Sequence, residues 1–148
     1  MLSGKECGLD DLASVDMRMS MGTALYFLSS LAVGIFGADA LTKRFETLPS
    51  EQIGASGFLF LLCLGASAIS TFCYAEKSRR LGRRTKWLMG LLGGVIAGAT
   101  FCAVVGAGYA GLFHALGFWF SAALMLALPI LVGWYWPFFD ARLLARHN

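Results

Sequence analysis

The chain has 148 residues, of which 57% are hydrophobic and only 14% are charged, and its formal net charge is +3. Soluble globular proteins are about 45–50% apolar and about 25% charged, so a water-soluble domain could not cover this much apolar surface. The mean hydropathy of +0.67 comes from a few long uncharged runs. This pattern predicts one compact, polytopic membrane unit.

The first 20 residues form a polar segment that we expect to be a cytoplasmic acidic tail. Ser3 and Glu6 have the spacing of a capping box, which favours a short helix lying along the membrane or across a basic loop. A disordered leader is the alternative for this segment.

Four uncharged stretches follow, and each is about as long as the 20 residues that a helix needs to cross a hydrocarbon core. They cover residues 21–38, 54–75, 87–109 and 115–136. We therefore predict an all-α fold with four transmembrane helices in a domain spanning residues 21–137.

The first stretch also has features of a signal peptide, because Ala38, Asp39 and Ala40 form an A-x-A cleavage pattern after an apolar run. The preceding segment is acidic, whereas a signal peptide begins with a short basic region. We expect an uncleaved first span.

The third and fourth stretches are separated by a few residues, 110–114, so the two helices should form a tight antiparallel hairpin. Pro129 should kink the fourth helix, since proline removes one backbone hydrogen bond. Pro137 is predicted to end that helix and to leave residues 138–148 as a short cytoplasmic tail.

Lysine and arginine accumulate on the cytoplasmic side of membrane proteins, and this rule sets the orientation. With both termini cytoplasmic, 10 of the 12 basic residues lie inside, and only Lys43 and Arg44 lie outside. The inside set is Lys5, Arg18, Lys77, Arg79, Arg80, Arg83, Arg84, Lys86, Arg142 and Arg146. The opposite topology would reverse this count.

The third stretch carries a ridge of small residues, which recur at every fourth position and so lie on one helix face. These candidate helix-packing residues are Gly90, Gly94, Gly98, Cys102 and Gly106. In lipid, small residues let helix backbones approach closely and gain van der Waals contact. The favoured partner is a helix of the same chain, with Ser30, Gly34 and Ala38 as the facing series. Contact with a second copy and the lining of a narrow pore are the alternatives.

Six basic residues lie within ten positions between the second and third stretches. The simplest interpretation is a topogenic signal that keeps this loop inside. The functional interpretation is contact with anionic lipid headgroups or a partner through Arg79, Arg80, Arg83, Arg84 and Lys86. So short a membrane-tethered segment does not predict nucleic-acid binding.

Residues that would carry chemistry are sparse in this sequence. Asp39 and His114 fall near the predicted outer boundary, His147 lies by the C-terminus, and the four cysteines form no CxxC pair. Ion-coupled carriers need an ionisable group within the membrane, and we predict none within the four spans. We therefore expect no enzymatic activity, no metal and no cofactor.

The sequence thus predicts a non-enzymatic subunit of a bacterial inner membrane. It would act through helix contacts in a homo-oligomer or in a larger assembly, such as a secretion, conjugation or phage-defence complex. The alternative is an oligomeric pore or small-molecule carrier, including a holin-like pore. Its weakly polar lining would come from Ser67, Ser70, Thr71, Thr100 and Ser121.

Overall fold

The computed structural model describes residues 20–45, 52–79 and 86–146. Every regular element in these ranges is a helix, and four of the helices are long and apolar enough to cross a membrane. The elements are α1 (Met21–Phe45), α2 (Gln52–Ser78), α3 (Lys86–Ala107), η2 (Gly108–Leu112), α4 (Phe113–Leu116) and α5 (Phe118–Ala145). The all-α prediction is confirmed in these terms. The predicted acidic tail, with its capping box, lies outside the described residues.

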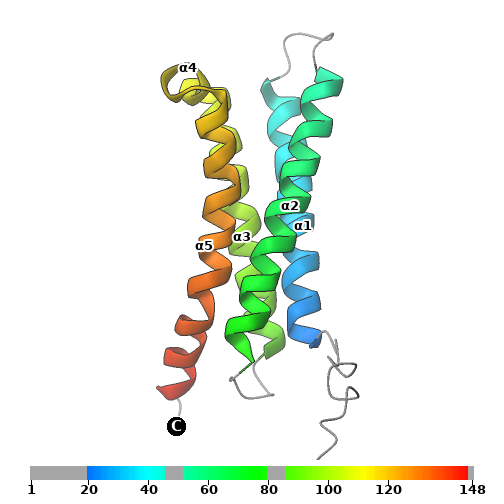
Figure 1. Cartoon of the computed structure of the whole chain (residues 1–148). Coiled ribbons are helices and arrows are strands. Elements are labelled where there is room, and N and C mark those ends of the chain that lie inside the picture. The colour runs from blue at the N-terminus through cyan, green and yellow to red at the C-terminus, as the bar shows by residue number, and fades with distance from the viewer. Residues whose placement is uncertain (1–19, 46–51, 80–85, 147–148) are drawn as a thin grey trace, which may run out of the picture.

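The four long helices stand side by side in a bundle, with α3 and α5 beside the pair formed by α1 and α2 (Figure 1). Each helix packs mainly on two neighbours, in the cyclic order α1, α3, α5, α2, and α2 and α3 also touch across the bundle. The α1–α3 contact is the most extensive, although α2 separates these helices in the sequence. The ends of α2 and α5 and the starts of α1 and α3 share one end of the bundle, which we call the Ser78 end.

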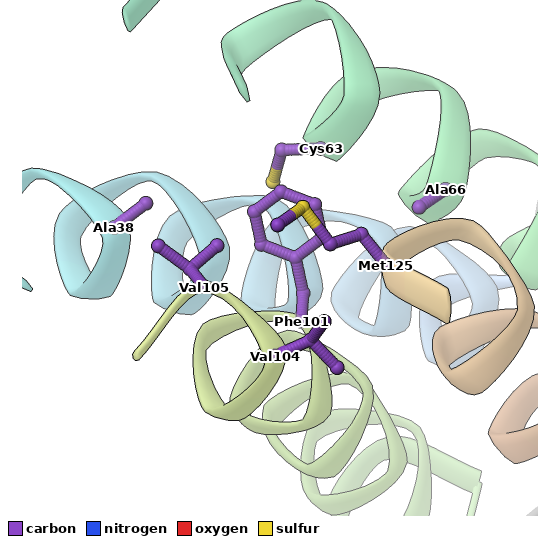
Figure 2. Close-up of a cluster of buried hydrophobic side chains, with 7 residues drawn as sticks. All are labelled: Ala38, Cys63, Ala66, Phe101, Val104, Val105 and Met125. Atoms are coloured by element: carbon purple, nitrogen blue, oxygen red, sulfur yellow. The ribbon is translucent and has the colours of Figure 1, made fainter. Parts of the chain in front are cut away.

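All four helices contribute to the apolar core. Figure 2 shows the ring of Phe101 from α3 at its centre, with Cys63 of α2 and Met125 of α5 against it. Ala38, Ala66, Val104 and Val105 complete the cluster, and all seven side chains are buried. Burying a large apolar side chain away from water contributes roughly 1.5–3 kcal/mol. In a lipid bilayer this gain would be smaller, because lipid tails are also apolar, and helix association would rest mainly on van der Waals packing.

Three helices extend beyond their predicted ends, and α2 ends at Ser78 rather than at residue 75. α1 continues past residue 38 to Phe45, and its last turns are stabilised by the ion pair of Lys43 with Asp39, at 2.7 Å. The prediction that Pro137 ends the fourth helix is wrong, because α5 continues to Ala145. A proline removes one backbone hydrogen bond, but beyond Pro137 the helix still packs on α2, where Asp140 is buried and accepts a hydrogen bond from Tyr74.

Two glycines shape the connection between α3 and α5. Gly111 has φ 110° and Gly117 has φ 81°, and both values lie in the left-handed region. Gly111 breaks the helix after α3, and Gly117 separates the short α4 from α5. A side chain at either position would cost about 1–2 kcal/mol, because its Cβ would crowd the following carbonyl oxygen.

Candidate functional site

The ridge of α3 lies against α1 of the same chain. A Cβ atom built on Gly90 would collide with the carbonyl group of Gly22. A Cβ atom built on Gly98 would lie 2.7 Å from the carbonyl oxygen of Ser30 and 2.8 Å from Cβ of Val33. Only glycine allows this approach, so the two backbones are nearly in contact along this seam.

The same contact runs along most of α1. A Cβ atom on Gly94 would collide with Oγ of Ser29 and with the carbonyl oxygen of Tyr26. Residue numbers rise together on the two sides, from Gly22 with Gly90 to Ser30 with Gly98, so α1 and α3 are parallel. Because these three α3 glycines are buried, they are covered by α1 rather than offered to a second copy.

The contact between the α3 ridge and α1 becomes less close toward the C-terminal ends of the two helices. Sγ of Cys102 donates to the carbonyl oxygen of Val33 at 3.3 Å, whereas a Cβ atom on Gly106 would make only ordinary contact with Leu41. Of the α1 series predicted to face the ridge, Ser30 and Gly34 contact it, and Ala38 lies in the core cluster. The larger contact residues, Tyr26 and Val33, were not predicted, because the facing series was chosen for its small side chains.

The basic segment is described only at its edges. Nζ of Lys77 lies 4.1 Å from the ring centroid of Trp134, and Arg79 pairs with Glu76 at 3.4 Å. Arg80, Arg83 and Arg84 fall outside the described residues, as does the side chain of Lys86. Contact of this segment with lipid or a partner therefore stays a prediction.

A line of polar side chains runs through the interior at the Ser78 end, and the sequence did not predict it. We call Asp140, Tyr74, Tyr26 and Ser70 the polar column. The hydroxyl of Tyr74 donates to Oδ2 of Asp140 at 3.4 Å, and its ring stacks on Tyr26 with centroids 4.5 Å apart. These contacts join α5, α2 and α1 through buried groups.

The hydrogen bonds beyond the ring stack have a defined direction. Oγ of Ser70 donates to the carbonyl oxygen of Pro129 at 2.6 Å, and it lies 2.6 Å from the hydroxyl of Tyr26. Since a serine hydroxyl has one proton, Tyr26 must be the donor to Ser70. Gly133 lets α2 and α5 approach here, because a Cβ atom on it would collide with the backbone carbonyl of Ser70.

Asp140 is the carboxylic acid of the polar column. Its side chain is 3% exposed, and its Oδ1 atom has no hydrogen-bond partner within the described part of the chain. The apolar span of α5 extends over Phe118–Leu143, past the predicted end at residue 136, and it therefore includes Asp140.

Asp140 continues the buried face of α5. Buried positions recur every fourth residue along α5, at Ser121, Met125, Pro129, Gly133 and Pro137. Extending this face by one further turn brings Asp140 into the interior. Because the helix was predicted to end at Pro137, this residue was assigned to a solvated tail, and its burial was not predicted.

The described residues hold no group of three or more His, Cys, Asp or Glu side chains that could bind a metal ion. Cys63, Cys73 and Cys102 are free thiols. His147 and the side chain of His114 lie outside the described residues. The geometry thus defines a four-helix bundle with an apolar exterior, a close seam of small residues and a buried carboxyl group. Comparison with family models, curated proteins and solved structures found no match.

Proposed function

We propose that the protein is an integral membrane subunit that acts through helix contacts in a homo-oligomer or a larger assembly of a bacterial inner membrane. In this proposal both chain ends are cytoplasmic, and the third and fourth spans form an antiparallel hairpin across the bilayer. The exterior supports membrane insertion, because Phe36, Phe72 and Trp119 are 74%, 71% and 79% exposed. Such surface suits lipid or a protein partner rather than water.

The observation that carries the proposal is a notch of small residues on the outside of α2. A Cβ atom on Gly65 would meet no atom within 4 Å, and Ala68 is exposed on the same face. Leu61 and Phe72, which are 64% and 71% exposed, flank this notch. We call these four residues the α2 outer face. Unlike the α3 ridge, it is open to a helix from another chain.

Replacing Gly65 and Ala68 together with leucine should fill the notch and separate the partner helix. We expect the detergent-extracted complex to lose mass, measured by light scattering, and to lose its intersubunit crosslinks in membranes. Thermal stability of the monomer should stay near that of the wild type, because the new side chains point away from the bundle.

Ala127→Leu is the matched control, because Ala127 is an exposed small residue on α5. It should leave the mass unchanged. A Gly65→Leu, Ala68→Leu variant that retains the wild-type mass and the same co-purifying proteins would contradict the proposed role of this face.

A carrier or pore is the second candidate, and the polar column is the observation that favours it. Three of the other predicted lining hydroxyls support it less. Thr71 and Thr100 donate to carbonyl oxygens of their own helices at 2.6 and 2.7 Å, and Ser121 donates at 3.2 Å to that of Gly117, just before α5. A pore should release a trapped dye from vesicles that contain the purified protein. For the subunit that we propose, we expect no release above that of empty vesicles.

A further inference from the structure

Asp140 is buried without a compensating positive charge among the described residues. On α2, Lys77 lies over Trp134, and Arg79 pairs with Glu76. On α5 itself, Arg142 is exposed to the surroundings. α1 has no charged residue before Asp39, and the side chain of Lys86, which begins α3, is not described. The polar contact of Asp140 in this part of the chain is therefore the hydroxyl of Tyr74.

The two protonation forms of Asp140 differ greatly in their cost at this site. An ionised carboxylate out of water costs several kcal/mol unless a cation or several hydrogen bonds compensate it. Within the described ranges, Asp140 accepts one hydrogen bond, of 3.4 Å to Oδ2, and none at Oδ1. A neutral carboxyl group carries no net charge, so its burial costs much less free energy. A proton is also small enough to bind Asp140 without a cavity beside the carboxyl group.

We propose that Asp140 is a proton-binding site that holds a proton when α5 is packed against α2. The carboxylate takes this proton from water at the Ser78 end and becomes a neutral carboxyl group. Tyr74 keeps its hydroxyl directed at the same group, and its stacking on Tyr26 fixes its orientation. Loss of the proton leaves a buried charge, which favours separation of the last turns of α5 from α2.

Infrared spectroscopy of the full-length protein in lipid bilayers reads out this site directly. At mildly acidic pH the wild type should show the C=O stretch of a protonated carboxyl group, and Asp140→Asn should abolish it. Tyr74→Phe should keep the band but shift it to higher frequency, because the carboxyl group loses its hydrogen bond. This second variant keeps the test valid if Asp140→Asn folds poorly.

Asp39→Asn is the matched control, because Asp39 is 53% exposed and ion-paired with Lys43. It should leave the band unchanged. A wild type without a protonated carboxyl band at mildly acidic pH, or a band that persists in folded Asp140→Asn, would overturn the proposal.

Proton binding also has a signature in stability. At mildly acidic pH the packed bundle holds a proton that the unfolded chain has released, so raising the pH should favour unfolding. The melting temperature of the wild type should therefore fall from acidic to alkaline buffer, and that of Asp140→Asn should fall less. Equal slopes for the two would count against the site. The α2 outer face points away from Asp140. Substitutions on that face should therefore change the mass of the complex without changing the carboxyl band, and Asp140→Asn should do the reverse.

Discussion

Replacing Gly94 with leucine should lower the free energy of unfolding in detergent by about 3 kcal/mol, at the upper end of the usual cost of overpacking. A Cβ atom here collides with Oγ of Ser29 and with the carbonyl oxygen of Tyr26. A backbone carbonyl cannot rotate aside as a flexible side chain can, so α1 must move as a unit. That movement would also pull Tyr26 away from Ser70 and Tyr74, so we expect function to fall with stability.

The matched control for this prediction is Gly65→Leu, the same substitution near the middle of α2, where a Cβ atom meets no atom within 4 Å. Thermal melts of both variants in a detergent that disperses oligomers would separate overpacking from a general effect of leucine. A Gly94→Leu protein that melts at the wild-type temperature would mean that α1 does not press on the ridge as described. Gly98→Leu should behave like Gly94→Leu, since it faces the carbonyl oxygen of Ser30.

Neutralising Arg79, Arg80, Arg83 and Arg84 together with glutamine should change how the chain inserts into the membrane. The proposed inside set would fall from 10 basic residues to 6, against 2 outside, and all four losses come from one loop. We expect a large fraction of molecules to place this loop on the outside. Labelling of a single cysteine at the exposed position 76, in a version without other cysteines, would measure that fraction from outside intact cells.

Lys43→Gln with Arg44→Gln is the control, because it removes charge from the proposed outer side and should preserve topology. If the neutralised loop stays inside but the protein no longer retains anionic lipid, headgroup contact is favoured over a purely topogenic role. Each basic residue near an anionic leaflet contributes about 1 kcal/mol to such contact. Unchanged topology together with unchanged lipid retention would contradict both interpretations.

The long helices could be predicted because uncharged runs of sufficient length are a property of the sequence itself. The regular spacing of Gly90, Gly94 and Gly98 likewise indicated a face of close approach. Their partner could not be predicted with the same certainty. Small residues show that a backbone comes near but not which one, and the partner face includes Tyr26 and Val33, which are not small.

The buried carboxyl group escaped prediction for a different reason. Helix ends depend on whether tertiary contacts outweigh the hydrogen bond lost at a proline, and this balance cannot be read from Pro137 alone. Once α5 continues past this residue, the period of the helix turns Asp140 toward Tyr74. An error of a few residues at one boundary thus moved an ionisable group from a solvated tail into the interior.

The pairing of α1 with α3 has a consequence for the order in which the molecule is assembled. Gly34 and Cys102, which meet across this contact, are 68 residues apart in the chain. At a synthesis rate of about 5–20 residues per second, the ribosome needs roughly 3–14 seconds to make the intervening segment. A helix forms in microseconds, so newly made α1 waits for seconds with its contact surface uncovered. In a chain that inserts into a membrane as proposed, α2, lipid or the insertion machinery would have to shield α1 until α3 is made.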